Sequence, residues 1–298
     1  MIESWEEFII IEKELNRIMN SADSNARIKK ALKYAISAGG KRVRPLIVLL
    51  SGKMCGCDYD KLMNLAIAVE LIHTASLLHD DVIDGAETRR GRIALNRKYS
   101  PSLAIILGDW LISKSVELTS VYGEYYIREF SRVGMMLSEG EALDLYSNQD
   151  GFGEREYFDC IGKKTAILFA YSAKTPCEIA GGDNLAVESL YKYGYNLGTA
   201  YQIVDDLLEY LRALKDKKSE SESMTLPRIY EREFGKRIAV EKTLEAIYKF
   251  RNESIRSLSI FPNSEEKEKL VRIVEFMTDK MLGESQLASA GILGQYKK

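Results

Sequence analysis

The chain has 298 residues, 46% of them hydrophobic, which is enough to bury one large core or, by length alone, two. Its 42 Lys and Arg residues nearly balance 44 Asp and Glu residues. The net charge of -2 excludes a general attraction to nucleic acid or to an anionic membrane. Any binding of anions must therefore be local.

Two further absences concern the cell compartment. The four cysteines follow neither zinc-site nor disulfide spacing, so we expect buried, reduced thiols. The chain begins without a basic region leading into an apolar stretch, and we find no apolar run near the roughly 20 residues that span a bilayer. We expect a cytoplasmic protein without a transmembrane segment.

The hydrophobic pattern is helical along almost the whole chain. Apolar residues recur at intervals of three and four, as at Leu62, Leu65, Ala66, Val69 and Ile72. Only five prolines interrupt the pattern, and alternating runs with hairpin turns are absent, so we predict an all-α helix bundle. Helix breaks are predicted at residues 39–40, 56–58, 100–101, 151–153 and 181–182, with Asp183 or Asn184 as a cap.

One segment lacks large apolar side chains. Residues 215–223 (KDKKSESES) are predicted to form an exposed loop, too short to link domains. We find no internal repeat and no second zone of composition. We therefore predict a single domain over residues 1–298.

Two basic segments flank the longest apolar helical pattern. They are GGKRVRP at residues 39–45 and TRRG at residues 88–91. Guanidinium groups match phosphate oxygens with paired N–H donors. Either segment alone is more often solvated surface, so its weight comes from the acidic clusters that accompany it.

The first acidic cluster ends that helical pattern, in the string HDDVID at residues 79–84. Asp80 and Asp84 are four residues apart and share a helix face. Adjacent like charges are tolerated on a wet surface, and a hard divalent cation also neutralises them. Taken alone, a solvated acidic helix end is the more common explanation.

The second acidic cluster changes that balance. Gln202, Asp205, Asp206 and Glu209 form one polar stripe on an otherwise apolar helix. Carboxylates at the edge of a buried face are costly without a counter-ion. Mg²⁺ commonly bridges a few carboxylates to substrate phosphates, so two facing carboxylate rows would clamp a diphosphate.

Four segments together carry a family resemblance: GGKRVRP at 39–45, HDDVIDGAETRRG at 79–91, GKKTA at 162–166 and GTAYQIVDDLLEY at 198–210. With them, most of the chain resembles the trans-isoprenyl diphosphate synthase (polyprenyl synthetase) family. The resemblance implies an antiparallel helix bundle around a deep central cavity, commonly as a homodimer. It also implies Mg²⁺-dependent condensation of isopentenyl diphosphate with an allylic prenyl diphosphate.

The resemblance further implies roles for individual residues. Mg²⁺ would be held by Asp80, Asp84, Asp205 and Glu209, with Asp81 and Asp206 supporting the clusters. Arg89 and Lys164 would hold the allylic diphosphate, and Thr165 and Gln202 would line the reacting centre. The diphosphate of isopentenyl diphosphate would be held by Lys41, Arg44, His73 and Arg90. The expected catalytic residues are Asp80, Asp81, Asp84, Lys164, Thr165, Gln202 and Asp205.

The chain departs from the family pattern in two places. Glu209 stands where the family usually has Asp, and the lysines usually found before the Thr-Leu-Pro string are missing ahead of Thr225. Lys215, Lys217 or Lys218 would have to substitute for them. These departures leave open a non-catalytic partner subunit of a heteromeric synthase as the alternative function.

Two other protein classes fit less well. A di-iron protein needs two Glu-x-x-His motifs, and the chain has only Glu70 to His73. A terpene cyclase needs no site for isopentenyl diphosphate, whereas both basic segments favour condensation.

The product length is predicted from the residues ahead of the first acidic cluster. Short-product relatives carry bulky aromatics four or five residues before its first aspartate, where this chain has Ser76 and Ala75. Ile72 and Val69 lie deeper and would form a partial floor. We expect a geranylgeranyl to hexaprenyl product, with geranylfarnesyl diphosphate as the central expectation.

Overall fold

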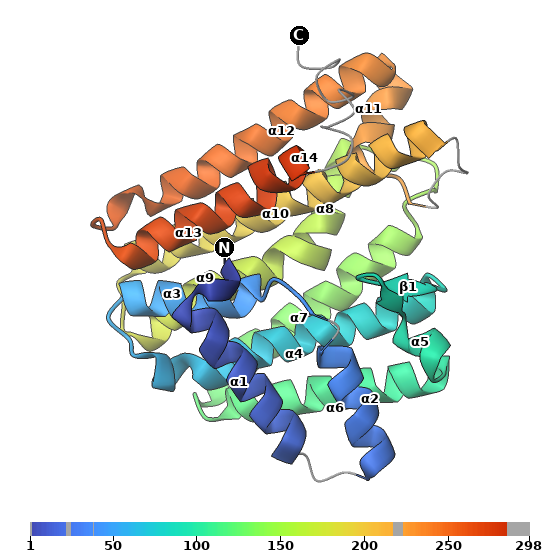
Figure 1. Ribbon diagram of the computed structural model, residues 1–298. Helices are drawn as coiled ribbons and strands as arrows, with labels where there is room; N and C mark the ends of the chain where they lie inside the picture. Colours follow the sequence, from blue (N-terminus) through green and yellow to red (C-terminus); the bar gives the residue numbers. More distant parts are fainter. Residues whose placement is uncertain (1, 22–24, 38, 217–222, 285–298) are drawn as a thin grey trace. The chain divides into compact units, whose positions relative to one another are not determined.

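The computed structural model describes residues 2–21, 25–37, 39–216 and 223–284 (Figure 1). The chain divides into two compact units, Met1–Ser131 and Arg132–Lys298, which we call the first and second units. The described residues are overwhelmingly helical, which confirms the all-α prediction. The single domain and the deep cavity stay predictions.

The first unit is built on α4 (Tyr59–Ile83), which packs against α3 (Val43–Met54) and α6 (Pro101–Ser120). Leu62, Leu65 and Val69 are fully buried on α4, because their spacing of three and four places them on faces covered by other helices. The remaining elements are a 3₁₀ turn at Ile2–Ser4, α1 (Glu6–Ser21), α2 (Ala26–Ile36), α5 (Leu95–Lys98) and the start of α7 (Glu124–Leu145).

A small hairpin follows α4 and was not indicated by the sequence pattern. Its strands, β1 (Thr88–Arg89) and β2 (Arg92–Ile93), pair antiparallel, with Arg89 opposite Arg92. The two turn residues, Arg90 and Gly91, have φ of 52° and 73°. Two positive φ angles form the tight turn that matches strand twist. Two-residue strands are too short to show a period of two in the sequence.

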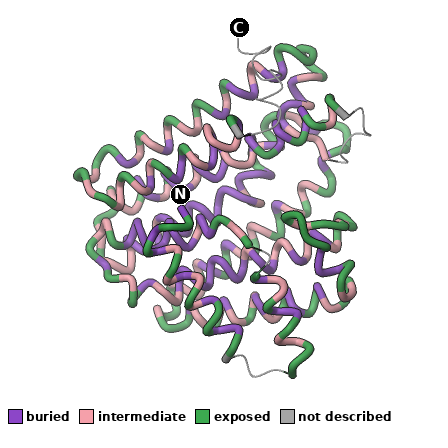
Figure 2. The backbone as a smooth tube through the Cα atoms, viewed as in Figure 1, coloured by how far each residue is buried: buried purple, intermediate pink, exposed green. Residues whose placement is uncertain are grey.

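The second unit is built on α10 (Asn184–Asp216), which packs against α9 (Ile167–Ile179) and α12 (Lys236–Ser257). Gly194 lets α9 approach, since a Cβ there would lie 2.3 Å from the carbonyl oxygen of Phe169. Burial is concentrated on the central helix of each unit and its neighbours (Figure 2). The remaining elements are α8 (Glu154–Ile161), α11 (Leu226–Phe234), α13 (Glu265–Glu275), α14 (Met281–Glu284), a 3₁₀ turn at Leu258–Ile260, and π-helical turns at Gly162–Ala166 and Phe276–Lys280.

The predicted helix breaks are confirmed at all five places. Asp183 caps α10, because its Oδ1 accepts a hydrogen bond from the backbone N–H of Ala186 at 2.8 Å. Lys215 lies in α10 rather than in the predicted loop, whereas Lys217 and Lys218 lie outside the described residues. The four cysteines are free, and three of them are buried, whereas Cys55 is only partly buried.

The length and composition of α4 make it a candidate membrane span. This helix is long and apolar enough to cross a membrane, with a mean hydropathy of 1.4 over its best window. However, 67% of that window is buried inside the protein. A buried core helix of a globular protein meets the same criterion, so α4 carries little evidence for a membrane span.

Candidate active site

The first acidic cluster lies at the C-terminal end of α4. Asp84 follows the last helical residue and is exposed, and Asp80 is half-buried one turn earlier. Asp81, between them, is only 2% exposed. The cluster therefore presents Asp80 and Asp84 outward and keeps Asp81 inside.

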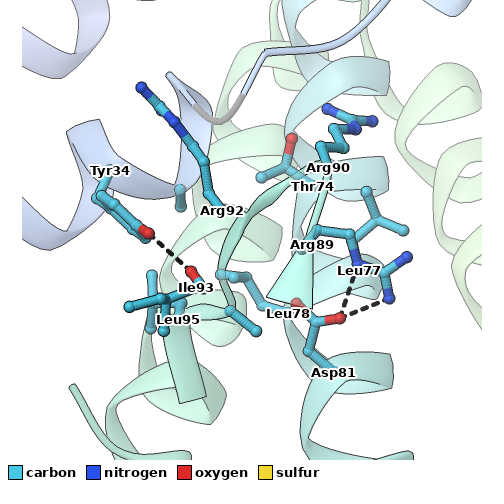
Figure 3. A pocket seen from close by; sticks show the side chains of 12 residues that line it. Tyr34, Thr74, Leu77, Leu78, Asp81, Arg89, Arg90, Arg92, Ile93 and Leu95 are labelled. Carbon is cyan, nitrogen blue, oxygen red and sulfur yellow. Dashed lines mark hydrogen bonds and ion pairs between the residues drawn. The ribbon is translucent and has the colours of Figure 1, made fainter. Parts of the chain in front are cut away.

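Asp81 is buried because the hairpin supplies its partner. The Nε of Arg89 donates to the Oδ1 of Asp81 at 2.7 Å (Figure 3). Asn96 of α5 fixes the backbone there by donating from Nδ2 to the carbonyl oxygen of Asp81 at 2.7 Å. Burial opposes the charged form of Arg89, but the hydrogen bond and charge of Asp81 outweigh it and raise the pKa of Arg89. Arg89 is thus a fixed cation beside the outward aspartates.

Next to this pair lies a pocket between α2, α4 and the hairpin (Figure 3). Its wall is apolar at Leu77 and Leu78 of α4 and at Leu95, and Arg90 lies at its edge.

Two of the residues expected to bind isopentenyl diphosphate, Arg44 and Arg90, lie near a third, His73 on α4. Burial and the positive charges of Arg44, Arg90, Arg42 and Arg89 lower the pKa of His73 well below its usual value. His73 is therefore neutral near pH 7. Arg44 lies in the first turn of α3, and Lys41 is exposed in the segment just before that helix. Arginines from residues 42–44 and from the hairpin therefore act on one neutral imidazole.

The second acidic cluster, on α10, has the same division. Asp205 and Glu209 are exposed, whereas Asp206 is 7% exposed. The Tyr157 hydroxyl donates to Asp206 Oδ2 at 2.5 Å, and Gln202 Nε2 donates to Asp206 Oδ1 at 2.9 Å. Burial raises the pKa of Asp206 to about 7, although these two hydrogen bonds oppose the rise.

The orientation of Gln202 follows from these contacts. Its amide nitrogen faces Asp206, so its Oε1 faces away and accepts from the Thr165 hydroxyl at 2.8 Å. A continuous chain of hydrogen bonds therefore links Thr165 to Tyr157. The structure brings Thr165 and Gln202 into contact and adds Asp206 and Tyr157 to the same group.

Lys164 and Thr165 are carried by the π-helical turn at Gly162–Ala166. Such turns insert one residue into a helix and are frequent at functional sites. Gly140 of α7 permits the close approach of this turn, because a Cβ there would lie 2.2 Å from the backbone nitrogen of Lys164.

Two acidic residues of α7 hold the Lys164 ammonium. Lys164 Nζ lies 2.8 Å from Glu141 Oε2 and 2.6 Å from Asp144 Oδ2. Burial would lower the pKa of Lys164, but these carboxylates raise it, so the side chain remains a cation. Sequence reasoning missed Gly140, Glu141 and Asp144. The sequence signal for them was a glycine followed by two acidic residues three positions apart, Glu141 and Asp144, which share one helix face.

The donor sets are suited to Mg²⁺ shared with a substrate. Among the described residues, no group of three or more His, Cys, Asp or Glu side chains could hold a metal ion by itself. Each cluster instead offers two outward carboxylates one helical turn apart. Mg²⁺ is commonly bound by one or two carboxylates, with water and substrate phosphates as its other ligands. The residues therefore fit this metal.

Comparison with known proteins places the chain in a family. Residues 25–259 match the polyprenyl synthetase family. The chain is 39% identical over 281 residues to geranylfarnesyl diphosphate synthase of Methanosarcina mazei, covering 94% of this chain and 95% of that one. A geranyltranstransferase structure from Methanosarcina mazei is 37% identical, with a TM-score of 0.84, and covers 95% of this chain and 100% of that one. A Caulobacter crescentus polyprenyl synthase, solved with calcium and isoprenyl diphosphate, is 30% identical, with a TM-score of 0.80, and covers 90% and 94%. The chain therefore belongs to the polyprenyl synthetase family of trans-isoprenyl diphosphate synthases.

Proposed function

We propose that this chain is a Mg²⁺-dependent polyprenyl diphosphate synthase that condenses isopentenyl diphosphate with an allylic prenyl diphosphate. One observation carries the metal assignment. In both clusters the middle acid is buried and held by the protein's own donors, while its neighbours face outward. Asp80, Asp84, Asp205 and Glu209 would hold Mg²⁺, and Asp81 would act by fixing Arg89.

The chain's own cations would assist departure of the allylic diphosphate. When bound, Mg²⁺ neutralises charge that develops on the leaving diphosphate. Arg89 and Lys164 would donate hydrogen bonds to the same group, and both are kept charged by buried or half-buried carboxylates. Preorganised donors stabilise developing charge because they need not reorient during the reaction.

The reacting carbon atoms would lie beside oxygen atoms. The Thr165 hydroxyl donates a hydrogen bond to Gln202 Oε1, so the lone pairs of the hydroxyl oxygen point elsewhere and would stabilise the allylic cation. Lys41, Arg44, Arg90 and neutral His73 would hold isopentenyl diphosphate so that its double bond attacks that cation. Loss of a proton to the released diphosphate then regenerates an allylic diphosphate that is one isoprene longer.

We also propose a product in the geranylgeranyl to hexaprenyl range, with geranylfarnesyl diphosphate as the central expectation. Ser76 supports it, since this small residue lies one turn before Asp80 and is half-buried. Similarity to the Methanosarcina mazei geranylfarnesyl diphosphate synthase supports the same length.

We propose that the protein is a cytoplasmic homodimer. Reduced cysteines are typical of the cytoplasm. The outer face of α6 exposes large apolar side chains, including Ile105 and Ile106, 44% and 58% exposed. Exposed apolar faces of this kind commonly mark subunit interfaces.

The purified chain, given Mg²⁺ and both diphosphates, tests the function. We expect prenyl diphosphate products from the chain alone, detected by chromatography. Asp80→Ala and Asp205→Ala should each lower turnover by ~10²–10³ at unchanged circular dichroism, because each removes an outward carboxylate.

Matched controls come from the same two helices. Asp60→Ala at the start of α4 and Glu188→Ala in α10 remove exposed acids distant along the helix and should leave turnover unchanged. Near-normal turnover in folded Asp80→Ala or Asp205→Ala would contradict the metal assignment. Activity that appears only with a second, different chain would favour the partner-subunit alternative.

A further inference from the structure

Arg42 is a buried charged residue that the proposed reaction does not use. It precedes α3 and is only 3% exposed. Its backbone adopts the left-handed conformation, with φ of 47° and ψ of 33°, which side chains with a Cβ rarely adopt. A strained backbone and a buried charge persist only where surrounding contacts determine them.

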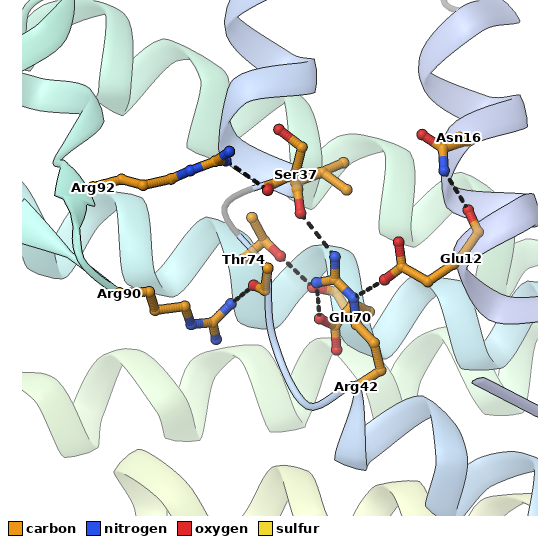
Figure 4. A network of polar contacts seen from close by, with 10 residues as sticks. Glu12, Asn16, Ser37, Arg42, Glu70, Thr74, Arg90 and Arg92 are labelled. Atoms are coloured by element: carbon orange, nitrogen blue, oxygen red, sulfur yellow. Dashed lines mark hydrogen bonds and ion pairs between the residues drawn. The ribbon is translucent and has the colours of Figure 1, made fainter. Parts of the chain in front are cut away.

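Three elements supply those contacts (Figure 4). The Arg42 guanidinium donates from Nε to Glu12 of α1 at 2.6 Å and from Nη1 to Glu70 of α4 at 2.7 Å. Its Nη2 donates to the carbonyl oxygen of Ile36, at the end of α2, at 2.8 Å. Arg42 therefore ties the segment at residues 39–42, which we call the basic loop, to α1, α2 and α4 at once.

The residues expected to bind isopentenyl diphosphate surround this tie. Lys41 and Arg44 lie on either side of Arg42 in the chain, and His73 lies one helical turn after Glu70. Arg90 donates from its guanidinium to the carbonyl oxygen of Gly39, in the basic loop. A shift of Arg42 would thus move the loop that presents Lys41 and contacts Arg90.

Part of the tie comes from outside the segment matched by the family. That match covers residues 25–259, whereas α1 covers Glu6–Ser21. Glu12 nevertheless supplies one of the two carboxylates that hold Arg42, and its side chain is 35% exposed. Removing one carboxylate from a buried cation leaves that charge undercompensated and displaces it.

We propose that Arg42 is a positioning residue and that α1, acting through Glu12, sets the affinity of the basic loop for isopentenyl diphosphate. This inference rests on the proposed placement of that substrate against Lys41, Arg44, His73 and Arg90. Arg42 is buried, and each of its three guanidinium nitrogens donates to a protein acceptor, so it would act on the substrate through its neighbours. Its effect is to hold the neighbouring cations in one geometry.

Steady-state kinetics of Glu12→Gln and Arg42→Lys test the proposal. Glu12→Gln keeps the shape of the side chain and removes its negative charge. Arg42→Lys keeps the positive charge and removes the planar guanidinium with its several N–H donors. We expect KM for isopentenyl diphosphate to rise about tenfold or more in each, because supporting hydrogen bonds of a site commonly matter at this scale. KM for the allylic diphosphate and kcat should change less than about twofold, because the rest of the site keeps its geometry.

Tyr59→Phe is the matched control. It removes a different hydrogen bond between α4 and α1, from the Tyr59 hydroxyl to Glu7 at 2.7 Å, without touching Arg42. It should loosen α1 to a similar extent, seen as a similar loss of thermal stability, while leaving KM for isopentenyl diphosphate unchanged. An equal rise of KM in Tyr59→Phe would show that Glu12 acts only through general stability and would overturn the proposal.

Lys41→Ala separates this inference from the function on which it rests. We expect Lys41→Ala to weaken the binding of isopentenyl diphosphate directly and so to raise its KM. If Lys41→Ala raises KM and folded Glu12→Gln does not, the proposed role of α1 is wrong, whereas the proposed function is unaffected. If Lys41→Ala leaves KM unchanged, the placement of isopentenyl diphosphate at the basic loop is itself wrong.

Discussion

The two middle acids, Asp81 and Asp206, occupy equivalent places in their clusters but have different partners. Asp81 accepts from a guanidinium, whereas Asp206 accepts from the neutral donors Tyr157 and Gln202. Burial without a cationic partner disfavours the charged form of a carboxyl group and raises its pKa. Asp206 therefore titrates near neutral pH in the metal-free protein.

This difference predicts how pH affects stability without metal. The pKa of Asp206 is about 7 in the folded protein against a usual value of 3.8. The folded protein therefore binds this proton more tightly than the unfolded chain does. The resulting contribution to stability is fully present at pH values below 3.8 and is lost as pH rises through about 7. Asp206→Asn removes this titration. Its free energy of unfolding relative to wild type should rise by on the order of 3 kcal/mol between pH 4.5 and pH 8, measured with urea in EDTA. The same difference between the two proteins at both pH values would refute the assignment.

The sequence indicated the carboxylates but not their partners. The stripe at Gln202, Asp205, Asp206 and Glu209 is visible because a helix repeats every 3.6 residues. Tyr157 lies 49 residues before Asp206, and no local pattern connects the two. For the same reason, Glu141 and Asp144 could not be assigned to Lys164 before the helices were packed.

At the scale of elements, Ser76 and Ala75 of α4 differ in burial, although the sequence analysis gave them the same significance for product length. Ser76 is half-buried, as are His73 and Asp80, three residues before it and four after it. These three residues share one helix face. Ala75 is fully buried among packed helices. The prenyl tail is therefore expected to pass Ser76 rather than Ala75.

Phenylalanine substitutions distinguish the two positions. Ser76→Phe should shorten the longest product by at least one isoprene unit, because one helical turn of about 5.4 Å is close to the length of an extended unit. Ala75→Phe should instead destabilise the protein by about 1–3 kcal/mol through overpacking. Product chromatography and thermal unfolding measure both effects. A wild-type product that stops at farnesyl diphosphate, or an unchanged product in folded Ser76→Phe, would contradict this path.

Most helix boundaries were predictable, because glycine and proline end helices for local steric reasons. The hairpin and the π-helical turn were not. The π-helical turn at Gly162–Ala166 differs from α-helix only in which carbonyl oxygen accepts each hydrogen bond, and composition does not record that choice.

At the scale of the whole molecule, the exposed apolar side chains of α6 favour the assembly of two copies of the chain. Leu107 and Leu111 are buried against the first unit, yet Ile105 and Ile106 lie exposed on the opposite side. Large apolar side chains gathered on an exposed helix face commonly mark an interface. A second copy of the chain would cover the exposed side.

We therefore expect a homodimer that Ile106→Lys weakens. Sedimentation across a range of protein concentrations should show wild type as a dimer and the variant shifted toward monomer. Ile238→Lys, a matched change at an exposed isoleucine of α12 that is 44% exposed, should leave the dimer intact. A monomeric wild type, or a dimer that Ile106→Lys leaves unchanged, would be inconsistent with an interface at α6.

The apolar character of α4 also affects how the chain is synthesised. This helix leaves the ribosome before α6, the helix with which it packs most extensively. Until residues 101–120 have followed, the nascent chain exposes a segment with the length and composition of a membrane span. Docking of α6 thus covers, on the helix that carries the first aspartates, an apolar surface that would favour aggregation if it stayed exposed.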